Sequence, residues 1–128
     1  MNDGHAVDVL YIEDNQVNAI LVARILERLP GVRLTVCTNG ESGFSAACSM
    51  SPALILLDLQ LPDIDGFEVL RRLRTEQFHA GPVFVLTADA SANSRERASQ
   101  AGADRVLTKP LQVAEFLQAV TVTLQAAA

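Results

Sequence analysis

The chain has 128 residues, of which 49% are hydrophobic and 20% charged, a composition typical of one ordinary globular domain. The net charge of −5 and the scattered Lys and Arg argue against a nucleic-acid-binding surface; only Arg71, Arg72 and Arg74 cluster, on what we expect to be a solvated helix face. No apolar run is as long as a membrane span and the first residues lack the basic segment of a signal peptide, so we expect a cytoplasmic protein with no direct nucleic-acid or membrane partner.

Strands and helices are predicted to alternate along the whole chain. The runs ALILL and VFVL are continuously apolar, which is typical of strands covered on both faces, and the long connections between strands require parallel pairing. We therefore predict an α/β fold, a doubly wound three-layer sandwich around a five-stranded parallel sheet, as a single domain over 1–128 with its core at about 7–125. The predicted strands are 7–12, 32–37, 53–57, 82–87 and 104–108, and the predicted helices are 16–29, 41–50, 66–77, 92–101 and 112–125.

The first helix has more apolar residues than one sheet-facing stripe requires. Asn15 can cap its start, Pro30 and Gly31 stop it, and Gly102 ends the fourth helix in the same way. Part of the apolar arc could be exposed for a partner, or Val22 and Ile25 could simply pack against the fifth helix or the sheet edge. The arc consists of Val17, Ile20, Leu21, Val22, Ile25, Leu26 and Leu29.

Neither the cysteines nor the histidines have the spacing of a site. Cys37 in a predicted strand and Cys48 in a predicted helix are interpreted as small buried hydrophobic residues. His5 and His79 are expected to be surface residues and not phosphodonors.

Acidic, hydroxyl and lysine side chains follow four of the predicted strands. Carboxylates gathered at the carboxyl ends of parallel strands repel one another by roughly 4 kcal/mol per pair at about 4 Å and an effective dielectric near 20, so they need a cation. Each residue alone has an ordinary explanation as a helix-entry, strand-end or loop residue, but together they indicate a divalent metal site. These residues are Glu13 and Asp14, then Asp58, Thr87 and Lys109.

At these positions the chain resembles the receiver domain of two-component response regulators, in the form associated with hybrid sensor kinases. The matching motifs are YIEDN at 11–15, LLDLQLPDIDG at 56–66, VLTA at 85–88 and GADRVLTKP at 102–110. The resemblance covers essentially 7–125, and it implies a flavodoxin-like sheet with the strand order 2-1-3-4-5.

The resemblance also implies a reaction. Asp58 would accept a phosphoryl group from a phosphohistidine of a histidine kinase or histidine phosphotransfer domain, and the protein would catalyse only its own phosphorylation and dephosphorylation. The residues around Asp58 would each have a role in this chemistry: Asp14, Asp58 and the backbone carbonyl of Gln60 as direct Mg²⁺ ligands, Glu13 as a ligand through water, and Thr87, Lys109 and the backbone N–H of Ala88 as phosphoryl contacts.

Several neighbouring residues refine this expectation. Pro62 fixes φ in the loop after Asp58, and Gly66 is expected to adopt a conformation closed to other residues. Asp63 and Asp65 are expected to be solvated loop carboxylates. We also hypothesise that two further side chains border the path of water to the acyl phosphate and set its lifetime: Gln60 and Asp89.

Valine occupies position 106, three residues before the lysine, where much of the family has Tyr or Phe. A valine cannot make the inward swing of that aromatic ring, because its side chain is short and stiff. We therefore expect a monomer that relays phosphate or docks a partner, with phosphorylation altering the surroundings of Thr87 and the fourth helix but not self-association.

Other interpretations remain open from the residues alone. An aspartate-nucleophile phosphatase of the haloacid dehalogenase type would need a second Asp two residues after the nucleophile, where this chain has Gln60. A flavodoxin-like flavin carrier would be coloured. A pseudo-receiver would keep the fold as an interaction module without being phosphorylated.

Overall fold

The computed structural model describes residues 6–75, 79 and 81–127, and it contains a five-stranded parallel sheet in the order β2-β1-β3-β4-β5. The predicted α/β class and strand order are both confirmed. In chain order the elements are β1 (Val7–Ile12), α1 (Gln16–Leu26), β2 (Val32–Cys37), α2 (Gly40–Met50), β3 (Leu54–Asp58), α3 (Gly66–Thr75), β4 (Val83–Thr87), α4 (Ala92–Gln100), β5 (Arg105–Thr108) and α5 (Val113–Ala127).

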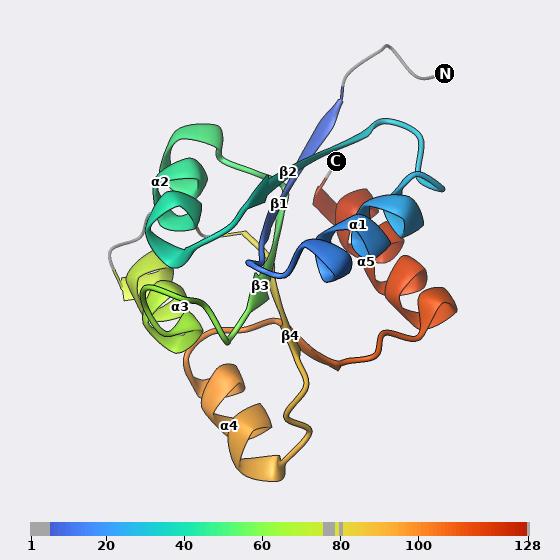
Figure 1. Ribbon diagram of the computed structural model, residues 1–128. Helices are drawn as coiled ribbons and strands as arrows, with labels where there is room; N and C mark the ends of the chain where they lie inside the picture. Colours follow the sequence, from blue (N-terminus) through green and yellow to red (C-terminus); the bar gives the residue numbers. More distant parts are fainter. Residues whose placement is uncertain (1–5, 76–78, 80, 128) are drawn as a thin grey trace.

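Helices cover both faces of the sheet and divide the hydrophobic core into two layers. Figure 1 shows α1 and α5 on one face, with α2, α3 and α4 on the other. All residues of β3 and β4 are buried, as the continuous apolar runs predict for strands between two helical layers. On the α1 and α5 side the strands contribute Val9, Tyr11, Leu54, Leu56, Phe84 and Leu86, and the opposite layer is built on Leu10, Ile12, Ile55, Leu57, Val83 and Val85.

The predicted cap of helix α1 is confirmed. Its apolar arc is partly buried in the core and partly exposed, so each of the two interpretations holds for some of its residues. The side chain of Asn15 accepts a hydrogen bond from the backbone N–H of Asn18 at 3.0 Å. Val22 and Ile25 are buried against the core. The remaining apolar residues of its first two turns are exposed, Val17 by 73%, Ile20 by 60% and Leu21 by 49%.

Some helix ends differ from their predicted positions. Helix α1 ends at Leu26 and not at residue 29, because the N–H groups of Arg28 and Leu29 bond carbonyls three residues back and tighten the chain into turns. Gly102 has φ +112° and ends α4 as predicted. Helix α5 continues to Ala127, two residues beyond its predicted end.

The predictions for Cys48, Gly66 and His79 are wrong. Cys48 is exposed, because it lies on the outer face of α2, whereas Cys37 packs half-buried against the core. Gly66 does not have a positive φ; glycine is needed there because a Cβ atom would lie 2.5 Å from the Cα of Leu59. His79 is 6% exposed and not a surface residue, and its Nε2–H donates to the carbonyl of Pro82. His5 lies outside the described residues.

Arg74 is not on a solvated helix face, unlike Arg71, which is exposed and pairs with Glu68. Its Nε donates to the Gly102 carbonyl, and its Nη1 donates to the carbonyls of His79 and Gly81 at 2.8 and 2.7 Å. Its Nη2 donates to Asp104, and that carboxylate also accepts from the first N–H of β4. Arg74 therefore joins α3, β4 and β5 at the amino ends of the strands.

Candidate functional site

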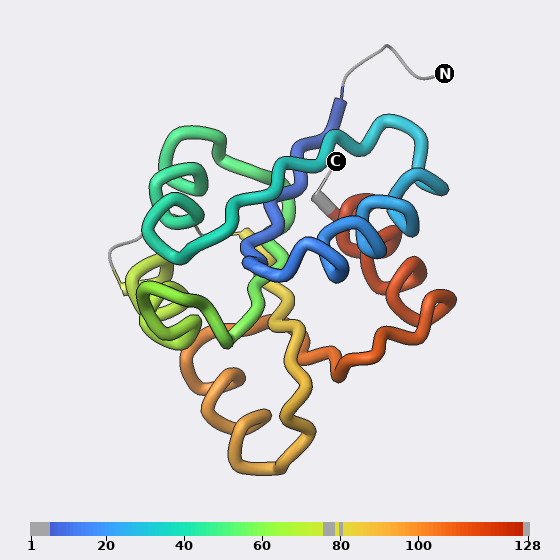
Figure 2. Tube along the Cα trace, viewed as in Figure 1, coloured from blue at the N-terminus to red at the C-terminus, as the bar shows by residue number. Residues whose placement is uncertain are grey.

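The site lies at the carboxyl ends of the strands, opposite to Arg74. There β1, β3, β4 and β5 run into the loops that follow them, as the trace in Figure 2 shows. Three polar side chains are buried there: Glu13 is 1% exposed, Thr87 4% and Asp58 6%. Asp14 is exposed at the rim, two residues before α1, and Lys109 is half-buried after β5. All five residues singled out in the sequence therefore lie at strand ends, as predicted.

The three carboxylates form one acidic group around a single ammonium. One oxygen each of Glu13, Asp14 and Asp58 lie within 4.8 Å of one another. The Nζ of Lys109 is 2.8 Å from Glu13 Oε1 and 3.6 Å from Asp58 Oδ1. The lysine therefore lies between the two buried acids and closer to Glu13.

The electrostatics of the two buried acids differ. Burial and a hydrogen bond shared with Glu13 raise the pKa of Asp58 to about 6, against the attraction of Lys109. Burial also acts to raise the pKa of Glu13, but hydrogen bonds with Asp58, Lys109 and Tyr11 together outweigh it and lower that pKa. One ammonium therefore does not compensate the charge of this group.

Thr87 connects the acidic group to α4. Its Oγ1 accepts a hydrogen bond from the N–H of Asp89, and its carbonyl accepts one from the N–H of Lys109 at 2.8 Å. The carboxylate of Asp89 accepts bonds from the Ser91 N–H and the Ser94 hydroxyl, so this side chain organises the start of α4. Ala88 and Gln60 are exposed beside Thr87 and Asp58, and the Gln60 N–H donates to Asp58 at 3.3 Å.

Three residues whose hydrogen bonds the sequence did not predict support the site and its loops. The Tyr11 hydroxyl donates to Glu13 Oε1 at 2.8 Å from inside the core, which the alternation of β1 could have indicated, since Tyr11 and Glu13 point to the same face. Asp63 remains exposed but accepts bonds from the N–H groups of Gly40 and Glu41, so the loop after β3 is joined to the start of α2. Asp65 likewise accepts from the Phe67 N–H at the start of α3.

The donors present at the site fit Mg²⁺. They are hard carboxylate oxygens, and their charge exceeds that of the nearby ammonium by two. Mg²⁺ prefers one or two carboxylates together with water and phosphate oxygens, and the exposed rim at Asp14 leaves room for both.

The profile of the response regulator receiver domain matches residues 9–121, which is most of the chain. The protein belongs to the response regulator receiver family. Receiver domains are signalling modules of two-component systems; they bind Mg²⁺ in an acidic site and interact with histidine kinases or phosphotransfer proteins.

Individual relatives extend this assignment. The KDP operon transcriptional regulatory protein KdpE of Escherichia coli is 37% identical over 118 residues, which are 92% of this chain and 51% of KdpE. The chain spans about half the length of such transcriptional regulators. The polar-differentiation response regulator DivK of Brucella anthropi is 32% identical over 113 residues, 88% of this receiver domain and 91% of DivK.

A solved receiver domain supplies a structural counterpart. The receiver domain of the sensor histidine kinase PA1611 from Pseudomonas aeruginosa is 31% identical and has a TM-score of 0.84, covering 94% of this chain and 98% of that one. That structure has a magnesium ion coordinated in its active site cleft. In the part of the receiver domain that our structure describes, no helix has the length and hydropathy needed to cross a membrane.

Proposed function

We propose that this receiver domain, spanning residues 7–125, is a phosphoacceptor in which Asp58 takes a phosphoryl group from a phosphohistidine. The observation that carries the proposal is the position of Asp58, a 6% exposed carboxylate with one ammonium and one other buried acid as neighbours. Burial raises the pKa of Asp58 to about 6, so the carboxylate is ionised at neutral pH and available as a nucleophile.

In the proposed reaction, an Oδ atom of Asp58 attacks the phosphorus of the phosphohistidine. The P–N bond breaks, its electron pair returns to the imidazole nitrogen, and a P–O bond to Asp58 forms. Lys109 balances charge on the phosphoryl oxygens, since its Nζ is already 3.6 Å from Asp58. The Thr87 hydroxyl and the Ala88 N–H donate to the same oxygens, because Thr87 is the last residue of β4, the neighbour of β3, and Ala88 directly follows it.

The acidic group also accounts for the proposed cofactor. Asp14, Asp58 and the carbonyl of Gln60 would hold Mg²⁺ directly and Glu13 would act through a water molecule. When bound, the ion neutralises charge on the phosphoryl oxygens during transfer. Before phosphorylation, Glu13 accepts hydrogen bonds from Lys109, Tyr11 and the N–H of Asn15.

We further propose that the phosphohistidine donor, a histidine kinase or histidine phosphotransfer domain, docks on the exposed start of α1. Asp14 lies two residues before this helix, so a donor that reaches Asp58 over the rim also meets the exposed apolar residues Val17, Ile20 and Leu21. Leu21 of this apolar patch and Lys109 of the site line the same cavity of about 80 Å³.

Charge placed on the patch should separate docking from chemistry. Leu21→Asp is expected to slow transfer from a phosphohistidine protein at least tenfold, because it buries a charge at the interface, and to leave transfer from phosphoramidate unchanged. Val122→Asp on α5 is the matched control, since Val122 is 52% exposed and lies away from the site. Equal transfer rates for all three proteins would disprove the docking proposal.

Intact-mass measurement after incubation with Mg²⁺ and phosphoramidate tests the phosphoacceptor role. We expect the mass of one phosphoryl group to be added to the wild type, and none to Asp58→Asn. A wild type that folds but never gains this mass would instead be a pseudo-receiver, and turnover of small phosphate esters would indicate a phosphatase.

The output of the phosphorylated state is expected to differ from that of relatives with an aromatic residue at position 106. Val106 is half-buried and packs beside the α2, α3 and α4 layer of the core. We propose that the chain relays phosphate as a monomer and that phosphorylation shifts the amide resonances of Thr87 and α4. Dimerisation through α4 and α5 on phosphorylation would contradict this.

A further inference from the structure

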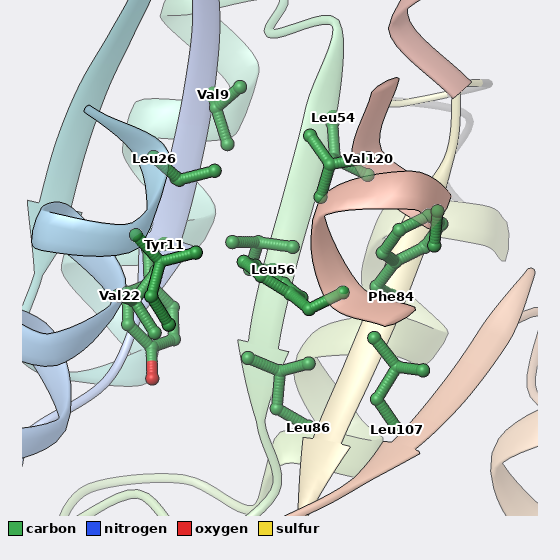
Figure 3. Packing of buried hydrophobic residues seen from close by; sticks show 13 residues of the cluster. Val9, Tyr11, Val22, Leu26, Leu54, Leu56, Phe84, Leu86, Leu107 and Val120 are labelled. Carbon is green, nitrogen blue, oxygen red and sulfur yellow. The ribbon is translucent and has the colours of Figure 1, made fainter. Parts of the chain in front are cut away.

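Tyr11 is the only tyrosine of the chain, and it lies wholly inside the core. Figure 3 shows its ring beside Val22, with the hydroxyl oxygen pointing toward the carboxyl ends of the strands. That hydroxyl donates to Glu13 Oε1 at 2.8 Å. The packing of the ring would be the same for phenylalanine, so the hydroxyl group needs an explanation of its own.

Glu13 has three hydrogen-bond donors and little access to water. Its Oε1 accepts from the Tyr11 hydroxyl and from the Lys109 ammonium, both at 2.8 Å. Its Oε2 accepts from the Asn15 N–H at 3.2 Å. Because Glu13 is 1% exposed, bulk water has little access to it, and the loss of any one donor leaves a buried oxygen with one partner fewer.

Lys109 has two tasks that compete. At rest its Nζ is nearer to Glu13, at 2.8 Å, than to Asp58, at 3.6 Å. When a phosphoryl group is attached to Asp58, the ammonium must turn toward the phosphoryl oxygens. Glu13 then loses a donor on Oε1, and Tyr11 is the donor that remains on this oxygen.

We propose that Tyr11 is a positioning residue that holds Glu13 while Lys109 moves to the phosphoryl group on Asp58. This inference rests on the proposed phosphoacceptor function. It assigns Tyr11 no contact with the phosphoryl group or the metal; the hydroxyl acts through Glu13 and Lys109. Without it, Glu13 retains Lys109 more strongly, and the phosphoryl-bound state becomes less favourable.

Binding of beryllofluoride, a phosphoryl mimic, to Tyr11→Phe at saturating Mg²⁺ tests this role by calorimetry. We expect the affinity for beryllofluoride to fall about tenfold. In the variant, Glu13 Oε1 has no donor once Lys109 has moved, and a buried hydrogen bond to a charged group typically contributes a free energy of this size. The affinity for Mg²⁺ alone should change less than threefold, because Asp14 and Asp58 are the proposed direct ligands.

Two further variants distinguish positioning from packing. Val9→Ala removes core packing on the same strand and in the same core layer, without a contact to Glu13, and should leave both affinities unchanged. In Lys109→Met, adding Tyr11→Phe should cause no further loss of beryllofluoride affinity, because the lysine through which Tyr11 acts is gone.

The outcomes separate the two proposals. A wild type that binds Mg²⁺ but not beryllofluoride would overturn the phosphoacceptor function itself. A wild type that binds both, with a Tyr11→Phe variant that keeps its beryllofluoride affinity or loses both affinities equally, would overturn only the role of Tyr11.

Discussion

At the amino ends of β4 and β5 one arginine has an acceptor for every nitrogen, whereas at the carboxyl ends of β1 and β3 two buried carboxylates share one ammonium. Arg74 donates to three backbone carbonyls and to Asp104. Asp58 instead has a pKa raised to about 6 by burial and by Glu13. The first end is electrostatically complete and stabilises the fold, and the second is unbalanced and ready to bind a cation and a phosphoryl group.

The largest expected effect comes from removing the arginine at the complete end. Arg74→Ala should lower the free energy of unfolding by about 3 kcal/mol, because it leaves several carbonyls and a carboxylate without their charged donor. Urea denaturation measures this difference. Arg71→Ala on the same helix should cost less than about 1 kcal/mol, since the Arg71 side chain is 52% exposed. Equal costs would mean that Arg74 is no more important than a surface arginine.

Binding of Mg²⁺ should stabilise the protein through the acidic group and independently of Arg74. At an Mg²⁺ concentration one hundred times its Kd, the free energy of unfolding should rise by about 2.7 kcal/mol through mass action. Thermal or urea unfolding in Mg²⁺ and in EDTA at matched ionic strength gives the increment. Arg74→Ala should keep the full increment and Asp58→Asn should lose most of it. An increment that Asp58→Asn retains would place the bound ion elsewhere.

Without metal, Asp58→Asn should stabilise the protein by about 2 kcal/mol at pH 7.5, because it removes the buried charge that the raised pKa reflects. The folded-state pKa of about 6 lies above the unfolded value of 3.8, so the stability contribution of wild-type Asp58 is present below pH 3.8 and lost as the pH rises through 6. The advantage of the variant should therefore shrink as the pH falls from 7.5 to 4. Asp14→Asn, at the exposed acid, should have a smaller effect. An Asp58→Asn variant that is less stable than wild type would show that the charge of Asp58 does not destabilise the folded protein.

A smaller pH effect of the opposite sign is expected at the amino end. Burial lowers the pKa of His79, so the folded state disfavours its protonated form. The corresponding stability is present above the unfolded pKa of about 6.5 and is lost as the pH falls below it. His79→Gln should reduce the loss of unfolding free energy between pH 7 and pH 5. An unchanged slope would mean that His79 is accessible to protons in the folded state.

The two ends also differ in how far the sequence could predict them. The site residues follow apolar runs, and parallel strands bring such positions together, so Glu13, Asp58 and Lys109 were recognisable. Arg74 and His79 were not, because most of their partners are backbone carbonyls, which leave no mark in the sequence. The one side-chain partner of Arg74, Asp104, lies 30 residues away. The predicted need for glycine at position 66 was right, but its cause, the approach to Leu59, depends on packing.

The structure of the protein crystallised with Mg²⁺ and beryllofluoride tests the central claim most directly. We expect the metal on Asp14 and Asp58, the beryllium on an Oδ atom of Asp58, and the Lys109 ammonium displaced from Glu13 toward a fluoride. An acidic group that stays empty under these conditions, with Lys109 still bound to Glu13, would contradict the account.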